Sequence, residues 1–512
     1  MRRRDAERAA SRAWPRRAPT PRGPILGLML CAALVTAAHA EELHQVRGVV
    51  HVHTDFTTGE FPLDEIVRRA ESQGVEAIFL SENYQLRVDY GLFPFRSLLR
   101  VTRAEPSVLA RGVDRYLATV ADARRRYPNM IIVPGVEVVP HYHWTGSPLA
   151  GDLTLHNIQK NILVFGVSTG AALRALPATG SAATARYSAQ SALDLLPALL
   201  VIPGALLLRR PVLRRRMIGR VAVFRPQRRW PSGGVLCAVG LVALARGLPF
   251  TTDAFSPYQD LGMTPYQELI DAVEQQGGAA VWSFPDAFDY GEERVVGLRV
   301  SRKTDPYGDD LLRTFRYSGF GGVYADTTRF PEPGAGWDYL LAQYARGERS
   351  RPAWLIGESG FHGDGDGTWI GAIETVFLVP AKSEAALLDA LRRGRVYGVL
   401  RTDRTNTPVL DRFTIRTAST VGVSGDTLDI SPATAIGVQA GVRMSDASEQ
   451  PIRVTLIRNG HIARTWSGTT PLAVDHQETF DGAPAYFRLE VRGPQTAYML
   501  SNPIILRPLR AQ

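Results

Sequence analysis

Cysteine is almost absent from this chain of 512 residues, because Cys31 and Cys237 are the only two. Each lies within an apolar run, so the remaining segments contain no cysteine. This excludes disulfide bonds, thiolate zinc sites and cysteine nucleophiles in those segments. Any metal site in those segments must be built from His, Asp and Glu. The sequence also lacks a glycine-rich phosphate loop of the Walker or dinucleotide-binding type.

The formal charge of +9 is unevenly distributed. Arginines are concentrated in the first 22 residues and between Arg209 and Arg229, and the remainder of the chain is nearly balanced. Both concentrations flank apolar segments, where the positive-inside rule accounts for them. We therefore expect a membrane rather than a nucleic acid as the partner of these arginines.

Residues 24–38 form the first apolar run and end at the small-x-small sequence Ala38-His39-Ala40. An Arg-rich start, a short apolar run and such a site are typical of a secretory signal peptide, so we assign 1–40 to it and expect the mature chain to begin near Glu41. The alternative is an uncleaved anchor helix. Both alternatives export the chain, and an A-x-A-like site fits a bacterial periplasm.

A second apolar pair, 192–208 and 231–250, brackets nine arginines between Arg209 and Arg229. Each run is close to the ~20 residues that cross a bilayer. We predict a transmembrane hairpin over 186–250, which would place the protein in the bacterial inner membrane with its soluble domains in the periplasm. A pair of buried-core or interfacial helices is the alternative.

The rest of the chain shows two patterns of apolar and polar residues. Residues 41–185 and 251–404 alternate short apolar strands with amphipathic helices, which predicts an α/β fold with a parallel, barrel-like sheet that the hairpin interrupts. Residues 405–512 alternate apolar and polar positions, which predicts an all-β sandwich. The Ala/Ser/Thr-rich stretch 169–192 is expected to be a linker. The predicted helices are 62–73, 113–127, 265–276, 337–344 and 384–393, and the predicted strands of the α/β part are 48–52, 75–80, 130–133, 162–167, 279–284, 322–324, 353–358 and 396–400.

His51 and His53 end the first predicted strand. Strand side chains repeat every two residues, so both imidazoles should lie on one face. In a β/α barrel this is the end at which catalytic groups collect, and neutral imidazole is a common ligand of zinc, iron or manganese. The pair is thus a candidate metal site, and Asp55, two residues further, is a candidate catalytic residue.

Six short stretches carry a family resemblance, namely His51-Val52-His53-Thr54, Ala77-Ile78-Phe79-Leu80-Ser81-Glu82-Asn83, Pro134-Gly135-Val136-Glu137, Asn161-Ile162-Leu163-Val164-Phe165-Gly166, Trp282-Ser283-Phe284-Pro285 and Ser359-Gly360-Phe361-His362. Through them the chain resembles the PHP (polymerase and histidinol phosphatase) superfamily of metal-dependent hydrolases. The likeness covers about 41–185 and 251–404, and it implies a distorted β/α barrel whose metal ions activate a hydroxide that attacks a phosphoester.

The resemblance also implies which ligands survive. His51, His53, Glu137 and His362 match expected metal ligands, and His362 is alternatively a catalytic proton donor. Four other ligand positions are substituted, and Glu82 is a milder change from aspartate. Asparagine is a poor ligand for a transition metal, and Phe and Gly offer no donor. A site for one divalent ion (Zn, Mn or Fe) is therefore expected rather than a multinuclear centre. The substituted positions are Asn83, Asn161, Phe284 and Gly360.

Three further histidines and two aspartates lie close to these stretches in sequence. They could compensate for the missing ligands, but short His or Asp/Gly clusters in loops rarely bind metal, so a surface loop and a flexible turn are the alternatives. The residues are His141, His143, His156, Asp364 and Asp366.

Two functions follow. The first is a metal-dependent hydrolase of small-molecule phosphoesters, with His51, His53 and Glu137 holding the ion. The second is a degenerate scaffold of the same fold that holds no ion and serves as a binding or signalling module.

Overall fold

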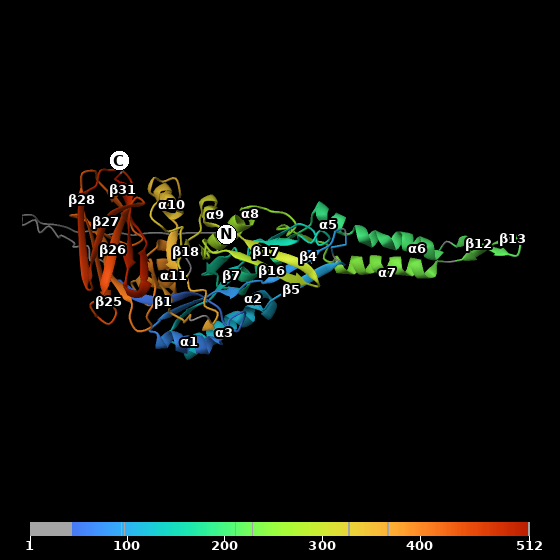
Figure 1. The fold of residues 1–512 in the computed structure, drawn as a ribbon, viewed down its shortest axis with the longest axis horizontal. Helices are drawn as coiled ribbons and strands as arrows, with labels where there is room; N and C mark the ends of the chain where they lie inside the picture. Colours follow the sequence, from blue (N-terminus) through green and yellow to red (C-terminus); the bar gives the residue numbers. More distant parts are fainter. Residues whose placement is uncertain are drawn as a thin grey trace, which may run out of the picture. The chain divides into compact units, whose positions relative to one another are not determined.

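A computed structural model describes residues 43–509 and shows a mixed α/β fold (Figure 1). The predicted signal peptide lies outside the described residues. Residues Glu42–Gln512 form one compact unit. Eight single residues within this span are not described, namely Pro94, Ser97, Arg210, Arg228, Asp326, Thr327, Asp366 and Gly367.

The predicted helices of the α/β part are present, and their apolar spacing explains them. In α1 (Leu63–Ser72) the buried residues recur at positions i, i+3, i+4 and i+7, which gives one apolar stripe. In α11 (Glu384–Arg393) the Ser383 side chain caps the start, and Gly394 ends the helix with φ +71°. The other predicted helices are α3 (Val113–Arg126), α8 (Thr264–Gln275) and α10 (Gly336–Ala345), and three short helices were not predicted, namely α2 (Val108–Arg111), α4 (Gly170–Arg174) and α9 (Gly308–Arg313).

The predicted strands of this part lie in two sheets, and both sheets are mixed rather than parallel as predicted. In the first, β1 is parallel to β2 but antiparallel to β20. In the second, β10 is antiparallel to both of its neighbours, β7 and β15. The first sheet contains β1 (His44–Val52), β2 (Ala77–Leu80), β6 (Ile131–Val133), β20 (Ile373–Val379) and β21 (Val396–Leu400); the second runs in the order β19 (Trp354–Gly357), β18 (Gly319–Val323), β15 (Ala279–Trp282), β10 (Ile162–Phe165), β7 (Gly135–Val138), β3 (Glu82–Asn83).

The two sheets meet where β1 and β19 end. Phe361 bridges to Val52, its backbone N–H donates to the carbonyl of His51, and the N–H of Ser359 donates to Val50. The ladders themselves do not close into a single barrel among the described strands. The ends of β1, β7 and β15 and the segment after β19 nevertheless converge around the two histidines.

After β21 the chain is all-β, and its strands share one buried apolar cluster. The first sheet continues from β21 into the C-terminal strands, and a second, four-stranded sheet lies on the same cluster. Within 498–506 the chain forms two strands rather than one, because the buried Asn502 between them bonds to Leu355 and Val396. The strands are β22 (Pro408–Arg416), β23 (Val421–Val423), β24 (Thr427–Ile430), β25 (Ala435–Met444), β26 (Pro451–Arg458), β27 (His461–Thr469), β28 (Leu472–Thr479), β29 (Ala485–Arg492), β30 (Tyr498–Ser501) and β31 (Ile504–Pro508).

Two helical stretches, Ala189–Arg209 and Trp230–Gly247, are long and apolar enough to cross a membrane. Only 17% of the most apolar window in each is buried, so neither is a buried core helix. Between them, Arg214, Arg215, Arg216 and Arg225 lie on the strands of a β-hairpin. The elements are α5 (Ala189–Asp194), α6 (Val201–Arg209), β12 (Val212–Ile218), β13 (Val221–Gln227) and α7 (Trp230–Arg246).

The expected linker 169–192 packs against the fold instead of forming a free connection, with Leu176 and Thr184 almost fully buried. Its small residues fit a confined space.

Several hairpins and short strands were not predicted. Besides β3, β7, β12, β13 and β20, the unpredicted strands are β4 (Arg87–Gly91), β5 (Arg100–Ala104), β8 (His143–Thr145), β9 (Thr154–His156), β11 (Ala185–Arg186), β14 (Thr252–Asp253), β16 (Asp289–Val295) and β17 (Leu298–Thr304).

Candidate metal centre

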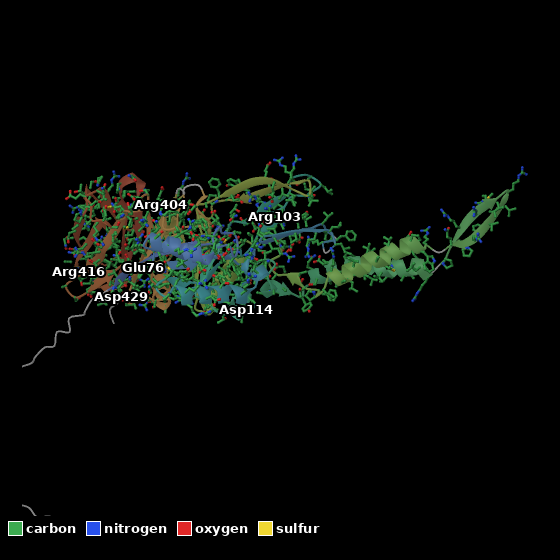
Figure 2. The ribbon with its side chains drawn as sticks, turned by 90° about the horizontal axis from the view of Figure 1, so that it is seen from below. Glu76, Arg103, Asp114, Arg404, Arg416 and Asp429 are labelled. Atoms are coloured by element: carbon green, nitrogen blue, oxygen red, sulfur yellow. The ribbon has the colours of Figure 1, made fainter. Side chains whose placement is uncertain are left out.

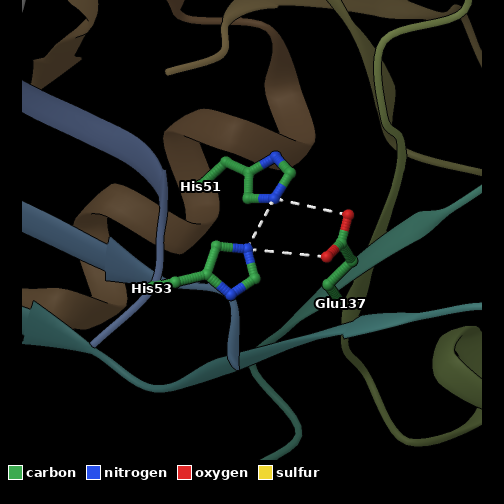
Figure 3. A group of neighbouring side chains, drawn as sticks. All are labelled: His51, His53 and Glu137. Carbon is green, nitrogen blue, oxygen red and sulfur yellow. Dashed lines mark hydrogen bonds and ion pairs between the residues drawn. The ribbon is translucent and has the colours of Figure 1, made fainter. Parts of the chain in front are cut away.

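His51, His53 and Glu137 converge in the interior (Figure 3). The two Nε2 atoms of the histidines are 3.0 Å apart. Glu137 Oε1 lies 3.4 Å from His51 Nε2, and Oε2 lies 3.5 Å from His53 Nε2. Among the described residues, this is the single group of three or more His, Cys, Asp or Glu side chains whose ligand atoms all lie within 4.8 Å of one another.

The spacing of these donors fits a single metal ion. Zinc binds imidazole nitrogen and carboxylate oxygen at ~2.0–2.2 Å, and two ligands of a tetrahedral ion are then separated by roughly 3.4 Å. The three separations of 3.0, 3.4 and 3.5 Å match that edge. The donor set, two imidazoles and one carboxylate, also suits zinc, iron or manganese.

The backbone at this place is unusual. His51 has φ +72° and sits where the pairing of β1 with β2 shifts register between Val50 and Val52. A bulge changes the direction in which a side chain points. His51 and His53 are therefore close together, as predicted, but the cause is the bulge rather than simple strand alternation. Phe284 and Gly360, which contact this region, also have positive φ, +40° and +58°. Left-handed backbone at non-glycine residues costs energy and is concentrated at functional sites.

Glu358 contacts the donor group and was not identified from the sequence. Its carboxylate is fully buried, and Oε1 lies 2.7 Å from His51 Nδ1. The Ser283 hydroxyl also donates to Oε1 at 2.5 Å, and the backbone N–H of Phe284 donates to Oε2 at 3.0 Å. A carboxylate on the far nitrogen of a metal-binding histidine fixes its tautomer and orientation. The one available signal was a glutamate that ends a predicted buried strand, 353–358.

Gly321 makes room for this carboxylate. A Cβ atom at Gly321 would lie 1.6 Å from Glu358 Oε2, so no larger residue is compatible with the observed position of Glu358. By contrast, the buried Nδ1 of His53 has no hydrogen-bond partner among the described residues. The two histidines are therefore held differently, one through a carboxylate and the other through packing.

The electrostatics favour a positive charge between these groups. Burial alone lowers the pKa of His51, but the carboxylates of Glu137 and Glu358 outweigh it and raise the pKa to about 10. Burial raises the pKa of Glu137, and the neighbouring His51 and His53 outweigh it and lower the pKa to about 2. Burial lowers the pKa of His53 well below its usual value. Without a metal ion, the pocket therefore favours an ion pair between a protonated His51 and an ionised Glu137.

The four substituted positions all border the donor group. Asn161 donates from Nδ2 to Glu137 Oε1 at 2.5 Å, and its buried Oδ1 has no partner among the described residues. Asn83 donates to the Thr58 hydroxyl at 2.8 Å. Phe284 stacks on His51 with ring centroids 5.2 Å apart. A Cβ at Gly360 would lie 2.8 Å from the Phe284 ring, so the ring occupies space beside His51.

His362 lies at the open edge of the group. Its ring stacks on His53 with centroids 4.0 Å apart, and its Nδ1 is 3.2 Å from the Thr58 hydroxyl. It is not one of the three converging donors. Asp55 is exposed and also lies outside that group, and its backbone carbonyl accepts a bond from Arg111.

Glu82 anchors the loop that follows the histidines. It is fully buried and accepts bonds from the backbone N–H of Thr54 and the hydroxyls of Thr54 and Thr57. Burial raises its pKa to about 7 despite these bonds. It therefore shapes the site without joining the donor group.

The three additional histidines form a separate stack. His143 lies between His141 and His156, with ring centroids 5.9 and 4.7 Å away. His141 and His143 are buried rather than on a surface loop, and His141 bonds to Thr179 and Gln259. Asp364 pairs with Arg69, and Asp366 lies outside the described residues. None of the described residues of this set joins the donor group.

No protein-family model matches the chain, and no curated protein sequence matches it. Among solved structures, it is similar to the crystal structure of a two-domain protein from Bacteroides vulgatus that contains a predicted PHP-like metal-dependent phosphoesterase. The two chains share 10% sequence identity and a TM-score of 0.35, over 88% of this chain and 91% of that one.

Proposed function

We propose that the protein is a metal-dependent hydrolase of phosphoesters, with one divalent transition-metal ion held by His51, His53 and Glu137. The observation that supports it most directly is the triangle of donors at 3.0, 3.4 and 3.5 Å. A bound ion of this kind supplies Lewis-acid activation of water and of the phosphoryl group. The phosphoester class follows from the PHP-type motifs around His51, Glu137 and His362.

The surrounding side chains have distinct roles in this proposal. Glu358 holds the His51 ring through Nδ1, so that Nε2 faces the ion. Asn161 fixes one oxygen of Glu137. His362, at the open edge, is placed to contact the substrate or to protonate the leaving alcohol. Water adds its oxygen to phosphorus, the ester P–O bond breaks, and the alcohol leaves with a proton.

A second candidate function is a degenerate scaffold that binds ligands without turnover. The observation that favours it is Phe284, whose ring occupies the space beside His51 where the PHP motif has a ligand. With three donors in the group, the site would hold one ion at most.

Metal content and turnover distinguish these functions. We expect the purified full chain to contain about one transition-metal ion per molecule and to hydrolyse bis(p-nitrophenyl) phosphate. His51→Ala should lose both properties, whereas His461→Ala, at an exposed position of β27, should lose neither. A metal-free wild-type protein whose thermal unfolding is unchanged by chelator would contradict the hydrolase and support the scaffold.

We also propose that the two apolar helical stretches tether the protein to the inner membrane. At ~1.5 Å per residue, 21 and 18 helical residues extend roughly 31 and 27 Å, close to the ~30 Å hydrocarbon core. The arginine-bearing hairpin β12–β13 would lie in the cytoplasm and the metal centre in the periplasm. The protein should then remain in the membrane fraction after a carbonate wash, and its release by that wash would favour interfacial helices.

A further inference from the structure

A cavity of about 190 Å³ lies between the β4–β5 hairpin, the β16–β17 hairpin and the strands β8 and β9. Its wall is largely apolar, with Val88, Trp144, Leu155, Ile158 and Val300 among the lining side chains. Leu155 and Val300 are at most 5% exposed, so the wall is part of a formed structure. For comparison, an apolar cavity of ~150 Å³ in another protein binds benzene.

The rim of this cavity is charged but balanced in sign. Arg103, labelled in Figure 2, reaches from β5 to Glu293 on β16, with a separation of 2.5 Å. Glu105 and Arg302 add one charge of each sign to the lining. The rim therefore does not select an anion or a cation, and the apolar interior determines what can bind.

Two chain segments connect this cavity to the metal centre. Ile158 and Gln159 line the cavity, and Asn161, two residues after Gln159, donates to Glu137. Consecutive Cα atoms are ~3.8 Å apart, so the Cα atoms of Gln159 and Asn161 are at most roughly 7.6 Å apart. The Tyr307 hydroxyl donates to the carbonyl of Ser283, the residue that contacts Glu358, and lies 3.5 Å from the carbonyl of Gln159.

The cavity wall is also bonded to the segment that follows the apolar helix α7. The backbone N–H of Trp144 donates to the carbonyl of Pro257 at 2.8 Å, and that of Gly91 donates to the Tyr258 hydroxyl at 2.8 Å. The tip of the β4–β5 hairpin exposes Phe93 and Leu99, which are 58% and 55% exposed. In Figure 1, β4 and β5 extend toward the end of the body from which α7 projects. This cavity is therefore on the side of the fold to which the apolar helices connect.

We propose that this cavity binds the apolar group of an amphiphilic phosphoester, with the phosphoryl group at the metal centre. The placement of the phosphoryl group rests on the proposed function, whereas the binding of the apolar group rests on the cavity alone. Each methylene that enters an apolar site contributes ~0.8 kcal/mol, or roughly fourfold in affinity. Affinity and turnover should therefore increase with the length of the alkyl group until the cavity is full.

The first experiment tests the cavity without metal. The full chain in lipid nanodiscs, stripped with chelator, is titrated calorimetrically with hexyl phosphate and with ethyl phosphate, and empty nanodiscs serve as the blank. We expect hexyl phosphate to bind at least tenfold more tightly. Leu298→Glu, which places a carboxylate in the rim, should reduce that ratio below threefold. Val296→Glu is the matched control, because Val296 lies on the same hairpin, is 81% exposed and does not line the cavity.

Both variants should unfold at the wild-type temperature, because both positions are exposed. A wild-type ratio near one, or equal ratios in Leu298→Glu and Val296→Glu, would overturn the proposal.

The second experiment restores the metal and compares p-nitrophenyl hexyl phosphate with p-nitrophenyl methyl phosphate. The value of kcat/KM should be at least tenfold higher for the hexyl ester, and Leu298→Glu should remove the difference whereas Val296→Glu should retain it. Equal turnover of the two esters would overturn the substrate class. Selective binding of hexyl phosphate with no turnover of either ester would refute the proposed hydrolase function and leave the ligand class of the cavity standing.

Discussion

Replacing Glu358 by Gln tests whether this buried carboxylate positions the metal-binding His51. The substitution keeps the shape of the side chain but removes its charge. In the wild type, the carboxylate lies 2.7 Å from His51 Nδ1 and also accepts bonds from Ser283 and the Phe284 N–H. A glutamine carbonyl can retain some of these bonds, but its NH2 group must face one of the three donors.

The expected magnitude follows from the charge that the substitution removes from these hydrogen bonds. A hydrogen bond to a charged group contributes ~1.5–3 kcal/mol, against ~0.5–1.5 kcal/mol for a neutral one. Removing such an outer partner of a metal-binding histidine weakens metal affinity by ~10–100-fold, or roughly 1.4–2.7 kcal/mol. We therefore expect Glu358→Gln to bind zinc about 10–100-fold more weakly and to show reduced turnover at subsaturating metal.

The assay is competition for zinc with a fluorescent chelator, together with thermal unfolding of the metal-free protein. Glu374→Gln is the matched control, because Glu374 is also a buried glutamate but pairs with Arg47 and Arg401. It should lower stability without changing zinc affinity. A change of less than threefold in the zinc affinity of a folded Glu358→Gln variant would refute the orienting role of Glu358.

Three further predictions concern packing and charge. Gly321→Ala should displace Glu358, since the added Cβ would lie 1.6 Å from Oε2. Zinc competition should then show a decrease in affinity at least as large as that of Glu358→Gln. A Gly321→Ala variant with wild-type zinc affinity would contradict this. Burial is the largest cause that lowers the pKa of His141 from 6.5 to about 4. The neutral, buried imidazole is therefore fully compatible with the fold above pH 6.5, and stability is lost as the pH falls from 6.5 through 4. At ~1.4 kcal/mol per pKa unit, the loss is up to roughly 3 kcal/mol. Unfolding of His141→Gln should therefore depend less on pH than that of the wild type over this window, and parallel profiles would contradict it. Asp338→Asn should cost about 3–5 kcal/mol in denaturant unfolding, because Asp338 pairs with the fully buried Arg488 through two bonds; a decrease below about 1 kcal/mol would show that the pair is dispensable.

The sequence by itself determined the local features of this protein. Helix α11 and strand β21 have the predicted bounds, because apolar spacing, a serine cap and a terminal glycine are all local signals. Three of the four residues that the motifs marked as ligands, namely His51, His53 and Glu137, form the donor group, while the fourth, His362, stacks beside it.

Only the tertiary structure decided how the site is completed. Glu358 lies 307 positions from His51 and Ser283 lies 75 positions from Glu358, and no local periodicity records such pairings. The positive φ of His51 results from a register shift between two strands, which the residues of one strand cannot reveal. The direction of β10 is likewise set by its neighbours, since an apolar run suits a parallel or an antiparallel position equally well. Local patterns specify which segments are strands or helices and which residues are candidate ligands, whereas their partners depend on contacts between distant segments that form only when the chain folds.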